Sequence, residues 1–322
     1  MRDIASCFSD YAVSVADTAS CASSSTQGSG SSIQNASTSL YNVTLSSQKK
    51  LMITVTWCKS QSSQGLSISF DNTSLQAFKL NTNSIFKRLK GAKVIEAKNT
   101  KVEVLWDLSA AKYLNGPEPV NGYYVLVMID SEIGLSLGDM AKDEANKRVK
   151  KGAYNARASL ISRREHCSGN SSYTTKAKFS DAGPSHDILI RCAGEGHHHQ
   201  PALSVCIDKK TVIRVKRLKW NFRGNQSIFI DGLEVDLLWD VHDWFFNPAS
   251  GYAVFAFRTT NGVHSSHWSD HKMVQKPQDK SVDFSLLIYA FSITVGSGQP
   301  IRARHVLKFR FQAHTTWQSR GE

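Results

Sequence analysis

The sequence lacks long apolar runs and has no recognisable secretory leader. The longest nearly apolar stretch, residues 284–295, is too short to span a bilayer as a helix. The first residues, Met1 to Ile4, lack the apolar core of a secretory signal. We therefore expect a soluble cytoplasmic protein, with the nucleus or a peripheral position on a membrane as alternatives.

Cysteines are few and widely spaced. The six of them, at positions 7, 21, 58, 167, 192 and 206, form no C-x-x-C pair and no zinc-type spacing with histidine. The run His197 to His199, which we place at a hairpin tip, comes without a second set of ligands. We expect reduced thiols and no metal.

Sequence motifs of catalytic and cofactor-binding sites are also missing. The chain contains no G-x-S-x-G, no Walker A and no G-x-G-x-x-G, and no Cys or Ser has a recognisable His/Asp partner pattern. We therefore expect no enzyme and no cofactor.

Acidic residues are outnumbered, with 27 Asp and Glu against 39 Lys and Arg, which gives a formal charge of +12. This excess favours an anionic partner. The 41% of apolar residues is typical of a globular chain.

Residues 18–39 consist mostly of Ser, Thr, Gly and Ala, so residues 1–39 are interpreted as an N-terminal segment that is largely a disordered linker. From residue 40 onward, short alternating runs broken by Gly, Asn and Asp predict strands.

An internal repeat is the strongest pattern in the chain. Residues 102–108, VEVLWDL, return as residues 235–241, VDLLWDV, and each copy is followed by Gly-Tyr and an apolar strand. Upstream, residues 66–71 match residues 203–208, and Cys58 falls opposite Cys192. Several matches in the same order indicate two copies of one unit.

The predicted fold is mainly β, with tandem duplicated antiparallel β-sandwich or small β-barrel units of about seven strands each and a short linking helix. The first repeat spans residues 40–138 and the second residues 166–291. Residues 139–165 form a basic linker helix and loop, and residues 292–322 a tail with a possible extra strand at 307–311. Sandwich or barrel, the packing of the repeats and the oligomeric state stay open.

The linker helix is predicted over residues 139–152. Ala141, Ala145 and Val149 recur every four residues, acidic residues lie early and basic ones late, and Gly152 marks the end. Because its apolar stripe is narrow, we expect the helix to lie on a sheet.

The repeated Trp-Asp pair has two interpretations. Trp106 and Trp239 are expected in the core, and Asp107 and Asp240 where a strand ends and a helical turn begins, as N-caps. In the second copy, however, Asp240, His242 and Asp243 lie within four residues and form a speculative polar site for acid/base chemistry or a metal.

A basic run distinguishes the second copy and carries the predicted anionic-partner site. Trp220 and Phe222 lie within it as core candidates first and base-stacking residues second. A change of side-chain face near Lys216 predicts a β-bulge. The linker helix adds four bases, which would join this surface if the helix packed beside it. The full set is Lys209, Lys210, Arg214, Lys216, Arg217, Lys219, Arg223, Lys147, Arg148, Lys150 and Lys151.

These observations favour a non-enzymatic binding or adaptor module that contacts lipid head groups or an acidic protein; nucleic acid is the weaker candidate. The alternative is a carrier of a small hydrophobic ligand in a cavity of the β unit.

Several longer sequence motifs resemble those of a plant family catalogued as domain of unknown function 868. They include MRDIASCFS at the start, TVTWCK from Thr54, GPEPV from Gly116 and RREH from Arg163, and the resemblance runs to about residue 290. It implies a plant source and brings no activity, cofactor or catalytic residue.

Overall fold

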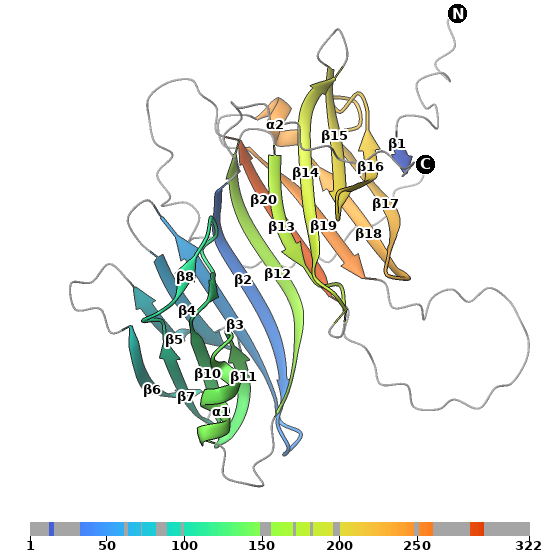
Figure 1. The fold of residues 1–322 in the computed structure, drawn as a ribbon. Helices are drawn as coiled ribbons and strands as arrows, with labels where there is room; N and C mark the ends of the chain where they lie inside the picture. Colours follow the sequence, from blue (N-terminus) through green and yellow to red (C-terminus); the bar gives the residue numbers. More distant parts are fainter. Residues whose placement is uncertain are drawn as a thin grey trace, which may run out of the picture.

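The computed structural model describes residues 13–15, 33–60, 64–71, 73–81, 89–97, 100–148, 156–169, 172–180, 183–195, 200–247, 251–259 and 284–292. The described chain is mainly β, as predicted, with two short helices (Figure 1). The predicted strand at 307–311 and the histidine run lie outside the described residues.

The strands form four sheets. The largest contains, in spatial order, β17 (Arg223–Ile230), β18 (Leu233–Asp240), β19 (Tyr252–Thr259), β20 (Ser285–Ser292), β12 (Arg157–Gly169), β2 (Ile33–Thr44), β3 (Lys50–Lys59), β4 (Gln64–Phe70) and β5 (Thr73–Asn81). A five-stranded sheet contains β1 (Val13–Val15), β16 (Lys210–Val215), β15 (Gln200–Ile207), β14 (His186–Glu195) and β13 (Ser172–Ala177). A four-stranded sheet contains β11 (Glu132–Leu137), β10 (Tyr124–Ile129), β7 (Thr100–Asp107) and β6 (Lys90–Ala97), and a small hairpin pairs β8 (Lys112–Tyr113) with β9 (Pro119–Asn121).

The five-stranded and the four-stranded sheet both cover the same face of the nine-stranded sheet. Directly paired residues on neighbouring strands point to one face. One such row pairs Val55 with Ser39, Ser39 with Arg163, and Arg163 with Leu286. Val55 belongs to the core under the four-stranded sheet and Leu286 to the core under the five-stranded sheet. The four-stranded and five-stranded sheets therefore lie over different parts of one continuous sheet, as Figure 1 shows. The four-stranded sheet with the part that it covers is here called the first sandwich, and the five-stranded sheet with its part the second.

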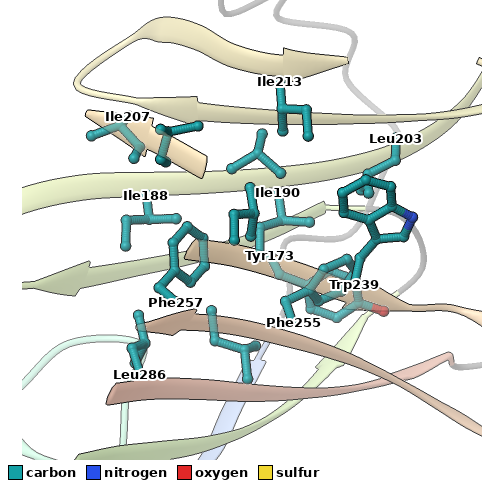
Figure 2. Close-up of a cluster of buried hydrophobic side chains, with 14 of the residues drawn as sticks. Tyr173, Ile188, Ile190, Leu203, Ile207, Ile213, Trp239, Phe255, Phe257 and Leu286 are labelled. Carbon is teal, nitrogen blue, oxygen red and sulfur yellow. The ribbon is translucent and has the colours of Figure 1, made fainter. Parts of the chain in front are cut away.

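Each sandwich has its own apolar core. The second core, drawn in Figure 2, brings Tyr173, Ile190, Leu203, Phe255 and Phe257 together from the two facing sheets. In the first core, Trp57 and Tyr123 meet edge to face, with ring centroids 5.8 Å apart. Large contacting side chains thus fill both interiors.

The sheet order corrects two expectations. No sheet closes on itself within the described ranges, so the barrel alternative is wrong for them. The expected basic loop up to residue 165 is also wrong in part, because residues 157–165 begin β12. That strand pairs with β2 on one side and β20 on the other, so the chain between the expected repeats is the strand that joins them.

The start of β2 lies in the expected linker. Residues 33–39 are strand despite their mostly polar side chains, because β12 pairs along this whole segment and β3 pairs on the other side from Ala36 onward. Ser37 and Ser39 are buried there. Backbone pairing on two edges outweighs low intrinsic preference for a strand. Residues 18–32 lie outside the described residues.

The helix α1 (Ala141–Arg148) lies on a sheet, as expected. Ala141 and Ala145 are buried against Leu105, Leu126 and Ile133, on the face of the four-stranded sheet that points away from the first core. Asp143 and Glu144 occupy its first turn and Lys147 and Arg148 its last, which suits the helix dipole.

Trp106 and Trp239 are core residues, as predicted, and each lies opposite a glycine. Gly91 pairs with Trp106 across β6 and β7, and Gly224 with Trp239 across β17 and β18. A Cβ at Gly91 would lie 2.8 Å from the Trp106 ring, and one at Gly224 would lie 2.3 Å from the Trp239 ring. Only glycine leaves room for the indole in each place.

Among the cysteines in the described part of the chain, Cys58, Cys167 and Cys192 are free, as expected. Cys206 is disulfide-bonded, so the expectation of reduced thiols is wrong for that residue.

Candidate functional site

The structure divides the predicted basic run between two ends of the second sandwich. Lys209 lies in the turn between β15 and β16, and Lys210 begins β16. Lys216 and Arg217 follow the other end of that strand, which is about 20 Å long for six residues. Arg214 lies between them, exposed on β16 opposite Ser14 of β1.

Residues 216–223, here called the basic loop, connect the five-stranded sheet to the nine-stranded sheet. Leu218 is fully buried and its backbone N–H donates a hydrogen bond to the Pro201 carbonyl over 3.0 Å. The side-chain amide of Asn221 donates to the Lys216 backbone carbonyl. The backbone carbonyl of Asn221 accepts a hydrogen bond from the Trp239 indole N–H. The loop is therefore held at its centre and at both ends.

This geometry corrects two predictions. Instead of a bulge, β16 ends at Val215 and Arg217 turns the chain with a φ of 51°, because the chain must cross between sheets. Trp220 is not a core residue, since 84% of it is exposed. Phe222 is half-buried and packs against the second core.

The charges of the basic loop differ in their partners. Arg223 pairs with Asp240, its Nε 2.8 Å from a carboxylate oxygen. Lys216, Arg217 and Lys219 are exposed and form no ion pair with any described residue. Three positive charges without an ion pair among the described residues thus precede an exposed tryptophan in the same loop.

The bases of α1 do not join this surface. Figure 1 places α1 on the first sandwich and β16 at the far side of the second. Lys147 and Arg148 both pair with Glu144 on their own helix. Lys150 and Lys151 lie outside the described residues. The structure therefore does not bring the two basic stretches together.

The speculative polar site has local structural partners. The Asp240 carboxylate accepts a hydrogen bond from the His242 backbone N–H over 3.0 Å, at the start of α2 (His242–Phe246). The His242 ring bonds to its neighbour Asp243. Asp107 accepts from the Ser109 N–H in the same way. The predicted N-cap role is wrong, because Val241 is the N-cap of α2 and has no side-chain capping bond, and a turn rather than a helix follows Asp107. Both aspartates instead bond to the backbone two residues ahead. No group of three or more potential metal ligands occurs among the described residues.

A buried ionic cluster lies where the two cores meet. On the shared sheet, Ser37, Ser39, Arg163 and Glu165, here called the polar seam, separate the two apolar clusters. Arg163 bonds to Glu165 at 2.6 Å and to Glu118, from the loop before β9, at 3.1 Å. Burial disfavours the charge of Arg163, but the two carboxylates outweigh it and raise its pKa. Glu165 is 0% exposed.

A histidine joins the two sheets at the end of the second sandwich opposite the basic loop. The ring nitrogens of buried His186 lie 2.6 Å from Asp208, in the β15–β16 turn, and 2.9 Å from Asp231, in the β17–β18 turn. Since a carboxylate only accepts, both contacts favour the charged ring, which carries a proton on each nitrogen. Burial lowers the pKa of His186, but the hydrogen bonds to both carboxylates outweigh it, so that pKa is raised.

The His186 contacts give a pH-dependent stability. Because the folded pKa of His186 lies above the unfolded value of about 6.5, its stabilisation is complete below that value and is lost as the pH rises through the folded pKa. Urea unfolding of His186→Gln should therefore show a loss of about 1–2 kcal/mol near pH 6, and a smaller loss near pH 9.

The matched control is Lys176→Gln, which breaks an ion pair with Asp187 whose two side chains are largely exposed. It should have little effect at either pH. An equal loss for His186→Gln at both pH values would contradict a charged His186.

Sequence reasoning missed the polar seam and the His186 contacts. Arg163 and Glu165 stand two apart in the word RREH, and Glu118 stands in GPEPV, but nothing in the sequence indicates that these words meet. The available indication was that charged side chains occur at alternate positions of a strand in which about half of the other side chains are apolar.

The described ranges form a mainly β structure in which two smaller sheets lie on one shared sheet, with an anchored, exposed basic loop. A family model described as "Plant protein of unknown function (DUF868)" matches residues 32–292, so the chain belongs to that family, as the sequence words indicated. No curated protein and no solved structure matches the chain. No helix in the described ranges is long and apolar enough to cross a membrane.

Proposed function

We propose that the protein is a non-enzymatic binding module that contacts an anionic partner through the basic loop. The observation that carries this proposal is the exposed Trp220 in the same loop as Lys216, Arg217 and Lys219, which form no ion pair with a described residue. Unpaired surface charges attract an anionic partner, and an exposed indole adds apolar contact area.

The anchoring of the loop supports the same function. A surface that is ordered before binding loses less conformational entropy on contact than a flexible tail does. Leu218 and Asn221 supply that order from inside the loop. Lys209 and Lys210, at the other end of β16, are not needed for this contact.

The test is a binding assay against two anionic surfaces, vesicles with phosphatidylserine and immobilised polyglutamate, at about 50 mM and about 300 mM salt. The triple variant Lys216→Gln/Arg217→Gln/Lys219→Gln should bind about a hundredfold more weakly at low salt, if each charge contributes about 1 kcal/mol. High salt should weaken the wild type and largely remove the difference.

A matched control removes the same charge from the first sandwich. Lys93, Lys101 and Lys112 are exposed and form no ion pair with a described residue. Their triple glutamine variant should bind as the wild type does. Equal weakening by both triple variants would reduce the effect to net charge, and absence of salt-sensitive binding to either surface would refute the proposal.

The two alternative functions have less support. Contacting side chains fill both cores, which does not favour a carrier of a hydrophobic ligand. Asp240, His242 and Asp243 are engaged in local bonds that explain their positions without catalysis. A small molecule that co-purifies in native mass spectrometry would revive the first alternative, and an activity that is lost in His242→Ala the second.

We also infer that the two halves are tandem duplicates. The strand orders β6-β7-β10-β11 and β17-β18-β19-β20 agree, and so do the glycine–tryptophan pairs. Asp71 and Asp208, both with φ of 49°, each exchange bonds with one residue of the preceding hairpin strand, Met52 and Asp187 respectively.

A further inference from the structure

Next to the basic loop lies a second exposed aromatic side chain, from a different element. Phe246, at the end of α2, is 58% exposed. Its ring packs edge to face against Phe222 of the loop, with centroids 5.7 Å apart. The Val241 N–H also donates to the Phe222 carbonyl. The basic loop and α2 thus form one end of the second sandwich, the upper end in Figure 1.

This end combines exposed aromatic rings with unpaired positive charge. Trp220, two residues before half-buried Phe222, and Phe246, which packs on Phe222, both expose their rings. The nearby acidic groups, Asp240 and Asp243, are each bonded to a basic neighbour or ring, Arg223 and His242. The charge left over, from Lys216, Arg217 and Lys219, is positive.

We propose that the anionic partner is a phospholipid bilayer, with Trp220 and Phe246 inserted at the interface and the three bases on the head groups. Indole rings favour the boundary between head groups and acyl chains. Basic residues near an anionic leaflet each strengthen binding about fivefold. An acidic protein would use the charges equally well, but would not require an indole whose whole face is open to solvent.

This inference rests on the proposed function and adds depth of insertion to it. The test uses the intrinsic fluorescence of the full chain with vesicles that contain phosphatidylserine and lipids brominated on the acyl chains. Trp57, Trp106 and Trp239 are buried in the cores, and Trp244 packs against the second core. Trp268 and Trp317 lie outside the described residues, so every variant is made in a Trp268→Phe/Trp317→Phe background. Quenching in the wild type that is lost in Trp220→Phe therefore reports contact between Trp220 and the acyl region.

Two further variants complete the test. Phe246→Ala should weaken partition into these vesicles about tenfold, because an inserted ring is lost. Phe229→Ala is the matched control, since Phe229 is 74% exposed but lies near the far end of β17. It should partition as the wild type does.

The outcomes separate this inference from the proposed function. Salt-sensitive binding to both anionic surfaces without quenching that depends on Trp220 would overturn insertion and leave electrostatic binding intact. Binding to polyglutamate alone would assign the surface to an acidic protein. Salt-sensitive binding to neither surface would overturn both proposals, whereas quenching lost in Trp220→Phe and weaker partition of Phe246→Ala would support insertion.

Discussion

Replacing Arg163 with methionine is expected to lower the free energy of unfolding by about 3–5 kcal/mol. Glu165 is 0% exposed and Arg163 is its ion-pair partner, so the variant leaves a carboxylate buried without a compensating charge. Methionine keeps much of the side-chain volume, which limits the contribution of lost packing. Urea unfolding at neutral pH measures the change.

Two further variants identify the cause. The double variant Arg163→Met/Glu165→Leu should recover most of the lost stability, because apolar side chains can replace a buried ion pair. Glu118→Gln should have a small effect, because Glu118 is partly exposed and reaches water. A double variant as unstable as Arg163→Met would show that the loss does not come from the unpaired charge.

Replacing Trp239 with alanine is expected to cost about 3–5 kcal/mol. The indole is buried in the second core, and its N–H donates to the Asn221 carbonyl that closes the basic loop. The variant therefore removes a large apolar side chain and a loop contact together. Urea unfolding should show the loss of stability, and binding to anionic vesicles should weaken as the loop loses order.

The glycine opposite Trp239 makes this prediction sharper. Gly224→Ala alone should destabilise by about 1–3 kcal/mol, because its Cβ would lie 2.3 Å from the indole. In the Trp239→Ala background the same change should be neutral or slightly stabilising, because the obstruction is gone and alanine restricts the unfolded chain. Gly91 and Trp106 should behave alike in the first sandwich. A Gly224→Ala effect of the same sign and size in both backgrounds would contradict the close packing.

Local pattern predicted the parts of the fold that depend on one strand or helix at a time. The alternation around Trp106 and Trp239 placed both rings in cores, and the spacing of Ala141 and Ala145 placed α1 on a sheet. The position of Asp107 and Asp240 after a strand predicted that each begins a turn, although the predicted N-cap role was wrong. These features need only short-range information.

Pairing between distant strands could not be predicted in this way. Ser37 and Ser39 have little preference for a strand, yet β12 and β3 pair with them. The parallel pairing of β12 with β20 joins segments more than a hundred residues apart, and no local pattern encodes it. The contact between Arg163 and Glu118 depends on the same long-range arrangement.

The candidate site was predicted in composition and missed in geometry. The basic run was visible as a sequence, but its strand separates Lys209 from Lys216. Leu218, Trp220 and Phe222 occupy every second position, which suggests that all three lie on one face of a strand, toward the core. The turn at Arg217 removes that periodicity, so only Leu218 enters the core.

The position of β12 between β2 and β20 also limits how the chain can be divided. A cut between the two sandwiches would uncover the long edge of β2 on one fragment and that of β12 on the other. Such uncovered edges pair readily with other chains and promote aggregation. Neither half is therefore a sound unit for expression by itself, and truncations designed to isolate the basic loop should retain both.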